Sequence, residues 1–297
     1  MKVLVTGSSG FVGRHVVSEL KNRKHEVHEF DLSKGDDMLD KAHLKKALKG
    51  IDAVIHLAAI VENGNPKLWE TNVEGTRRVI DAAVGAKAEK FVYLSSTGVY
   101  GDTKGEVNEK SRTAPENDYE KSKLEAEKIV LERQEEISVS VVRSAMVFGA
   151  NDYWKKMFKM LEKGYPLPCK GTNHFQVIDA ADLARALALA LEKGEDGETY
   201  LAAGEDTLTL NEFCEAGKEA LGFAKKGKVG HMPAWLALLM GKILGMGVLT
   251  KENIRHLGKE RRYDIRKIKA LGFSQKRSIR DSIKDVAESL KGKATLK

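Results

Sequence analysis

The chain has 297 residues, of which 42% are hydrophobic and 31% charged, and its formal net charge is +7 at pH 7. This length and composition exclude a disordered chain and suit one large α/β domain, alone or with a smaller lobe. The two cysteines, Cys169 and Cys214, lack metal-ligand spacing, and no signal-peptide pattern opens the sequence, so we expect a cytoplasmic protein without a metal site.

The chain begins with a short apolar strand, a glycine-rich turn and a helix. Residues 3–5 form the strand, residues 6–13 the turn, and the helix should reach Asn22. Glycines here permit a tight turn and a close approach of the backbone to a pyrophosphate, which the helix N-terminus attracts. The context predicts a dinucleotide site with contacts from Gly7, Ser9, Gly10, Phe11, Val12 and Gly13.

A second strand, residues 25–31, ends in Asp31, 18 residues after Gly13. An acid at this place can accept both hydroxyls of the adenosine ribose and repels a 2′-phosphate, which favours NAD over NADP. Lys34 lies nearby and could accept a 2′-phosphate, so NADP is the alternative cofactor. The alternative interpretation of Asp31 is an ordinary surface residue at the end of a strand.

Three further strands are expected at residues 52–59, 91–96 and 139–143, with a helix over residues 66–84 between the first two. Alternating strands and helices with short connections predict a Rossmann-type, doubly wound parallel sheet. Ligands of such sheets bind at the carboxyl ends of the strands. Ser96, at the end of the fourth expected strand, should therefore lie at the ligand edge.

A helix that should deliver Tyr119 to this edge carries Lys123 one turn later, on the same face. Of the two other Tyr-x-x-x-Lys pairs, the one at 100/104 is interrupted by Gly101 and is typical of a loop, and the one at 263/267 lies in a run of basic residues with no upstream partner. To act as a base at neutral pH, the Tyr119 phenol needs its pKa lowered by about three units, or roughly 4 kcal/mol. A neighbouring positive charge can supply this stabilisation.

Taken together, these motifs resemble the NAD-dependent epimerase/dehydratase group of extended short-chain dehydrogenases/reductases. The resemblance runs almost end to end, over residues 6–13, 37–40, 56–59, 72–76, 95–101, 119–123, 143–149 and 177–184. It implies that Tyr119 exchanges a proton with the substrate hydroxyl, that Lys123 holds the nicotinamide ribose and lowers the Tyr119 pKa, and that Ser96 bonds the same substrate oxygen. Further cofactor contacts are implied for Asp37, Met38, Leu57, Ala58, Ala59 and Asn72.

Three reactions remain open on the sequence. An epimerase of a nucleotide sugar is favoured; a dehydrogenase or reductase of a more apolar alcohol or ketone, similar to steroid and flavonoid reductases, is the alternative; and a regulator without chemistry is the weakest, because the Ser-Tyr-Lys set is complete. Dehydration is not expected, since Thr97-Gly98 stands where dehydratases of the family carry an Asp-Glu pair. Substrate contacts are predicted for Thr97, Arg143 and His174.

The resemblance divides the chain into a dinucleotide-binding domain, residues 1–148 with 175–203 returning to its sheet, and a smaller, mostly helical substrate lobe, residues 149–174 and 204–297. It also implies a homodimer through the helices near Pro66 and Tyr119. Residues 251–297 hold 15 Lys/Arg against 6 Asp/Glu, which indicates a solvated helical surface or a site for an anionic partner; no nucleic-acid partner is predicted. The apolar segment 234–249 is shorter than the ~20 residues that span a bilayer, so we expect a buried, substrate-covering or interfacial helix.

Overall fold

The computed structural model describes residues 1–223, 229–243, 245 and 249–291. The expected segment 234–249 is therefore described only in part. Its described portion includes helix α8, Ala234–Ile243. Within the described residues, no helix is long and apolar enough to cross a membrane.

A six-stranded parallel sheet forms the centre of the molecule, in the strand order β2-β1-β3-β4-β6-β9. In that order its strands are Glu26–Phe30, Lys2–Thr6, Ala53–His56, Lys90–Ser96, Ser138–Ser144 and Glu198–Ala202. The prediction of a doubly wound α/β fold is confirmed. The third strand ends at His56, three residues earlier than expected, because the chain leaves the sheet there.

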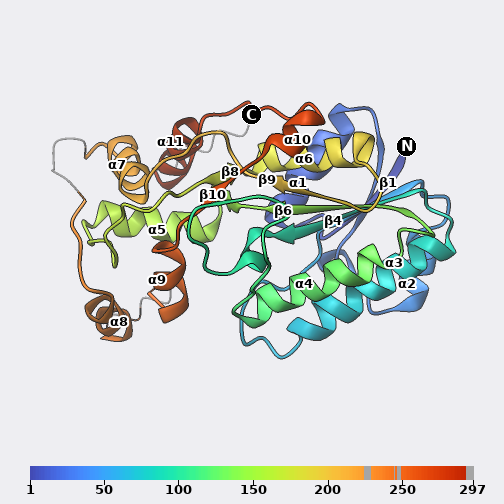
Figure 1. Ribbon diagram of the computed structural model, residues 1–297, viewed down its shortest axis with the longest axis horizontal. Helices are drawn as coiled ribbons and strands as arrows, with labels where there is room; N and C mark the ends of the chain where they lie inside the picture. Colours follow the sequence, from blue (N-terminus) through green and yellow to red (C-terminus); the bar gives the residue numbers. More distant parts are fainter. Residues whose placement is uncertain (224–228, 244, 246–248, 292–297) are drawn as a thin grey trace.

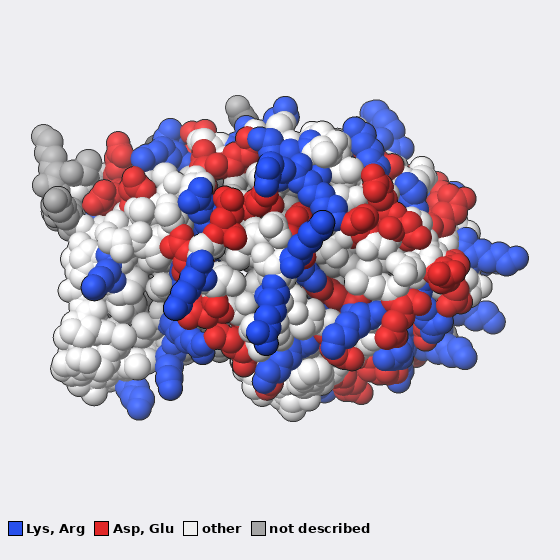
Figure 2. Space-filling model, viewed as in Figure 1, with Lys and Arg blue, Asp and Glu red and all other residues white. Residues whose placement is uncertain are grey.

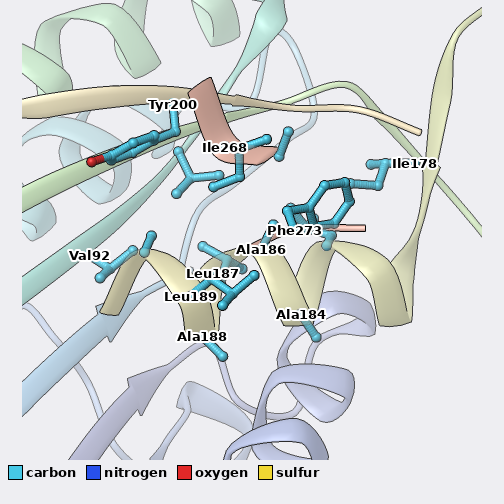
Figure 3. Packing of buried hydrophobic residues seen from close by; sticks show 14 of the residues in the cluster. Val92, Ile178, Ala184, Ala186, Leu187, Ala188, Leu189, Tyr200, Ile268 and Phe273 are labelled. Atoms are coloured by element: carbon cyan, nitrogen blue, oxygen red, sulfur yellow. The ribbon is translucent and has the colours of Figure 1, made fainter. Parts of the chain in front are cut away.

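Helices cover both faces of this sheet (Figure 1). On one face lie α1, Phe11–Asn22, and α6, Ala180–Lys193; on the other lie α2, Lys41–Ala47, α3, Thr76–Gly85, and α4, Asp118–Leu131. Each face has its own apolar core. Figure 3 shows one of them, where small and large side chains of α6 pack with Val92 and Tyr200 of the sheet and with Ile268 and Phe273 from the end of the chain. Burial of this apolar area is the main force that holds the helices on the sheet.

The helix expected over residues 66–84 includes a π-helical segment. Residues Glu70–Gly75 form this segment, η2, and α3 continues from it without a break. Such segments widen one turn and often mark functional sites. Two short 3₁₀ segments, η1 at Leu32–Lys34 and η3 at Thr97–Tyr100, follow β2 and β4 directly.

The lobe is mostly helical and lies beyond the carboxyl ends of the strands (Figure 1). Its helices are α5, Asp152–Glu162; α7, Leu210–Ala220; α8; α9, Lys251–Leu257; and α11, Ile279–Leu290. The expected return of residues 175–203 to the main sheet is wrong for its first strand. This strand, β8, Val177–Asp179, pairs with β7, Met146–Phe148, in a separate two-stranded sheet, and only β9 joins the large one.

After α9 the chain returns to the half that contains the large sheet. Strand β10, Arg262–Tyr263, pairs with β5, Glu106–Val107, and α10, Arg266–Ala270, packs beside β9. The side chain of Lys267 donates a hydrogen bond of 2.7 Å to the carbonyl oxygen of Thr199 in β9. The C-terminal region thus contributes to both halves of the molecule.

Candidate active site

The glycine-rich turn between β1 and α1 is built for close backbone approach. Gly7 has a positive φ of 69°, and a Cβ there would lie 2.9 Å from the backbone nitrogen of Ala58. A Cβ at Gly13 would lie 2.1 Å from the carbonyl oxygen of Gly7. Helix α1 begins after Gly10 with no side-chain cap and no acid in its first turn. Its first N–H groups therefore remain available to an anion, which fits the pyrophosphate of a dinucleotide.

Asp31 lies beside this turn, directly after β2. Its carboxylate accepts hydrogen bonds from the backbone nitrogens of Ser9 and Ser33, both at 2.9 Å, and from the Ser33 hydroxyl at 2.6 Å. Burial alone would raise the pKa of Asp31, but these hydrogen bonds outweigh it and hold the pKa below its ordinary value. A charged carboxylate at the turn fits the hydroxyls of an adenosine ribose and opposes a 2′-phosphate.

The predicted adenine contacts, Asp37 and Met38, lie in the segment that leads to α2. Asp37 accepts a hydrogen bond of 2.8 Å from the backbone nitrogen of Leu39. Met38 is buried against η2, where a Cβ on Gly75 would come within 2.8 Å of the Met38 methyl group. The Met38 thioether therefore presents an apolar surface at the predicted adenine site, and the absence of a side chain at Gly75 leaves space for it.

Asn72 joins three parts of the site from its place in η2. Its amide accepts a hydrogen bond of 2.8 Å from the backbone nitrogen of Ile60 and donates one of 2.9 Å to the Ile60 carbonyl. It also donates to the hydroxyl of Ser122 in α4, at 3.0 Å. The amide thereby fixes the segment after β3, which holds the predicted contacts Leu57, Ala58 and Ala59. In this structure Asn72 acts as a brace between that segment and α4.

Ser96, Tyr119 and Lys123 come from β4 and α4. The N-terminus of α4 is fixed by a capping box between Asn117 and Glu120, so Tyr119 enters in the first turn. The Tyr119 hydroxyl lies close enough to the side chain of Ser96 for that side chain to lower the Tyr119 pKa. Lys123 is buried one turn later, with its Nζ 4.2 Å from the centroid of the Tyr93 ring. The structure thus brings the three predicted catalytic residues to one edge of the sheet.

Burial shifts both titrating groups of this set. Tyr119 as a whole is only half-buried, but its hydroxyl is enclosed, and desolvation raises its pKa to about 12. Desolvation lowers the pKa of Lys123 to about 7, against an opposing effect of Glu127. The expected lowering of the Tyr119 pKa by Lys123 is wrong for this structure, because enclosure of the phenol and the Glu120 carboxylate both raise this pKa and only Ser96 opposes them.

The three predicted substrate contacts occupy different places. Thr97 borders the cavity described below and donates a hydrogen bond of 3.0 Å to the hydroxyl of Tyr263. Arg143 points away from that cavity into a buried ion pair with Glu127, with an Nη2 to Oε2 distance of 2.6 Å. His174 also lies outside the lining and pairs with Glu260. The prediction that Arg143 and His174 contact the substrate is therefore not supported by this structure, in which both side chains form ion pairs within the protein.

A cavity of about 590 Å³ opens between the sheet edge and the lobe. Ser96 and Tyr119 line it. The other polar residues of its lining come from the start of α4 and from three further segments of the chain: Asn117 and Glu120; Glu62 and Asn63; Tyr153; and Thr250, Asn253, His256 and Arg261. A larger groove of about 970 Å³ lies between α2 and α3 and holds none of the predicted site residues. Because the cavity of about 590 Å³ contains Ser96 and Tyr119 and many polar groups, we take it as the candidate active site.

Arg261 is the principal residue that the sequence analysis missed. Its side chain is buried at 7% exposure and lines the cavity, and no carboxylate of the described residues pairs with it. Its Nη2 donates to the carbonyl oxygen of His256 at 2.9 Å, whereas its Nε has no hydrogen-bond partner. Buried guanidinium groups are ordinarily paired. An unpaired one in a cavity indicates a site for an anion.

The pKa of His256 reports the same positive surroundings. Burial and then the charges of Arg261 and Lys259 lower it to about 4, so the imidazole is neutral at physiological pH. Glu116 opposes this lowering of the His256 pKa, but more weakly than Arg261 and Lys259 cause it, and it pairs with Lys259, at 2.6 Å, and with Arg255. The only hint in the sequence was the general basic excess after residue 251.

Comparison with known proteins identifies relatives of this chain. Residues 3–203 match the model of the NAD-dependent epimerase/dehydratase family. The chain is 26% identical to N-acetyl-α-D-glucosaminyl-diphospho-ditrans,octacis-undecaprenol 4-epimerase of Escherichia coli O157:H7, over 91% of the chain and 89% of that protein. It is 28% identical to sterol demethylase protein B of Methylococcus capsulatus, over 69% of the chain and 70% of that protein.

The fold has a similar counterpart among solved structures. UDP-glucuronic acid 4-epimerase from Bacillus cereus, solved in complex with NAD, superimposes with a TM-score of 0.80. The alignment covers 98% of this chain and 99% of the other at 23% identity, a likeness that establishes the fold.

Proposed function

The chain belongs to the NAD-dependent epimerase/dehydratase family, and from that premise we propose that it is an epimerase that uses NAD to invert one carbon of a nucleotide sugar. One observation carries the choice of substrate. Arg261 is buried in the cavity that Ser96 and Tyr119 line, and its charge has no counter-ion among the described residues. A sugar diphosphate would bring the anion that this guanidinium lacks.

The proposed cofactor is NAD, and the residues that would hold it are those of the glycine-rich turn, Asp31 and Lys123. The cradle at Gly7 and Gly13 fits the pyrophosphate, and the ionised carboxylate of Asp31 favours the form without a 2′-phosphate. When bound, NAD supplies the group that takes up a hydride from the sugar carbon and returns it.

The chain's own residues would handle the proton and the orientation of the sugar. With a pKa of about 12, Tyr119 keeps its proton at neutral pH and can donate it to a keto oxygen. The opposite half-reaction needs a cation near the phenol, and Lys123, with a pKa of about 7, is charged in about half of the molecules near neutral pH. Ser96 would hold the same substrate oxygen and fix its direction.

The test combines product analysis with two variants. Purified protein and NAD are incubated with UDP-linked sugars; epimers are followed by proton NMR and free NADH by absorbance. We expect epimer formation without net NADH, and a loss of turnover of about 100-fold or more in Tyr119→Phe with NAD binding retained. Arg261→Gln should raise KM far more than it lowers kcat, because it removes binding of the diphosphate.

A different pattern would favour the alternative dehydrogenase or reductase. Net NADH from an apolar alcohol, together with unchanged kinetics in Arg261→Gln, would contradict the sugar substrate. Full turnover in Tyr119→Phe would refute the proposed role of the phenol. Mass spectrometry of the small molecules released on denaturation is an independent check. Because an epimerase regenerates its NAD within each turnover, we expect NAD to remain bound to the purified protein and to be detected.

A further inference from the structure

Helix α8 exposes a stripe of large apolar side chains. Trp235 is 66% exposed, Leu239 46% and Ile243 71%. They follow one another at intervals of four residues and so lie on one face of the helix. Only seven large hydrophobic side chains are this exposed in the described part of the chain, and three of them are on this face. Single exposed apolar residues are ordinary, whereas a contiguous group marks a contact surface.

The orientation of α8 is the reverse of an ordinary surface helix. Its buried positions are small, Ala237 and Gly241. A Cβ on Gly241 would lie 2.8 Å from the Cβ of Leu249, so this small residue lets the segment after the helix approach it closely. A surface helix normally turns its large apolar residues to the core and its polar residues to water. Packing through small residues instead leaves Trp235 and Ile243 directed to solvent.

The sequence around this stripe is basic. The sequence from residue 220 to 251 contains five lysines and no Asp or Glu. Two of these lysines, Lys242 and Lys251, are described and exposed. Figure 2 shows this end of the molecule, below and beside α8, as a surface with few charges, and those visible there belong to Lys or Arg. An apolar face with exposed lysines beside it is complementary to an apolar layer under an anionic surface.

We propose that the exposed face of α8, with Lys242 and Lys251, docks the protein onto the surface of an anionic lipid bilayer. Ten residues of helix extend only about 15 Å, so α8 would lie in the plane of the interface. The Trp235 ring is suited to the boundary between head groups and acyl chains. The docking surface is independent of the reaction that the cavity performs.

A second copy of the chain fits this surface less well. In a symmetric dimer the same patch faces itself, so the stripe of one copy would meet the stripe of the other and Lys242 would approach its own counterpart. No acidic residue in the surrounding sequence, from 220 to 251, is present to offset that repulsion. An anionic bilayer supplies both the apolar depth and the counter-charge.

The proposal is tested by sedimentation of the full-length protein with vesicles of phosphatidylcholine alone and of phosphatidylcholine with phosphatidylglycerol. We expect binding to the anionic vesicles that is at least about tenfold tighter than to the neutral ones and that weakens with salt. The triple variant Trp235→Ser, Leu239→Ser, Ile243→Ser should lose at least about tenfold in affinity for the anionic vesicles. Trp69→Ser, which changes a 45% exposed Trp outside α8, is the matched control and should bind as the wild type does.

Fluorescence gives a second readout that does not depend on the triple variant's folding. Of the three Trp residues, Trp235 is the most exposed, so its emission should shift to the blue on anionic vesicles. The shift should persist in Trp69→Phe and disappear in Trp235→Phe. Absence of both sedimentation and shift in the wild type would overturn the proposal, as would binding that the α8 variants leave unchanged. A wild-type dimer that ignores vesicles and dissociates in the triple variant would assign the face to a second copy instead.

Discussion

Replacing Glu127 by Gln should destabilise the fold strongly, although the side chain keeps its size. Glu127 and Arg143 are almost completely buried and share three contacts, of 2.6, 3.0 and 3.2 Å. The Gln amide keeps one acceptor oxygen but no charge, so the Arg143 guanidinium remains in the interior without a counter-charge, with the neutral Tyr100 hydroxyl at 2.7 Å and the more distant carbonyl of Glu109. Breaking a buried pair in this way costs about 3–5 kcal/mol.

The assay is equilibrium unfolding in urea, followed by circular dichroism, with Glu125→Gln as the matched control. Glu125 lies on the same helix and pairs with Lys128 at 2.9 Å, but both side chains are exposed, so its loss should change the free energy of unfolding by less than about 1 kcal/mol. Melting temperatures should follow the same order, with a fall of roughly 6 °C or more in Glu127→Gln.

A loss below about 1 kcal/mol in Glu127→Gln, or a loss equal to that of Glu125→Gln, would refute the reasoning. The same variant should also lower the pKa of Lys123 further, because Glu127 is the charge that opposes the effect of burial on that amine. Comparison of the pH dependence of turnover in Glu127→Gln with that of the wild type would detect this second effect.

Three other perturbations have measurable outcomes. Asp31→Ala should narrow the preference for NAD over NADP in calorimetric titrations, and an unchanged ratio would show that Asp31 does not contact the ribose. Gly13→Ala should weaken dinucleotide binding and cost about 1–3 kcal/mol of stability, because the new Cβ would meet the Gly7 carbonyl at 2.1 Å; unaltered affinity and melting would contradict the cradle. Lys123 has its pKa lowered from 10.5 to about 7, so above pH 7 the unfolded chain binds the extra proton and stability rises with pH. From pH 7 to 9 the wild type should gain roughly 2 kcal/mol of unfolding free energy relative to Lys123→Met, and parallel stability curves would argue against a buried amine.

The sequence was sufficient to predict most of the sheet and the three residues at its edge. Short apolar strands that alternate with helices leave few parallel arrangements, and the strand that ends in Ser96 and the helix that begins before Tyr119 follow from local patterns. Pairing between strands is not local. The sequence predicts that residues 175–203 return to the large sheet, but nothing in the pattern of residues 177–179 distinguishes the edge of that sheet from β7.

The missed features all depend on contacts between distant segments. Arg261 enters the cavity because its backbone forms hydrogen bonds with residues 174 and 176. No sequence pattern around residue 261 or around residues 174–176 predicts that these two segments pair. Arg143 was expected at the substrate, but its partner Glu127 could be assigned only once α4 lay beside β6. The pKa of Tyr119 was predicted in the wrong direction because the degree of enclosure of a hydroxyl is a property of the packed site.

The return of the C-terminal region to the dinucleotide-binding half has a consequence for how the chain can be divided. Strand β9 is the outermost strand of the large sheet, and α10 packs beside it, with Ile268 and Phe273 completing the core under Tyr200. A fragment that stops before Arg262 would lack this cover, and its bare edge strand would be open to pairing with other chains. During synthesis the core of the large sheet can therefore be completed only after the residues from 262 onwards have been made. We expect aggregation and dependence on chaperones to be greatest for the ribosome-bound intermediate that still lacks them.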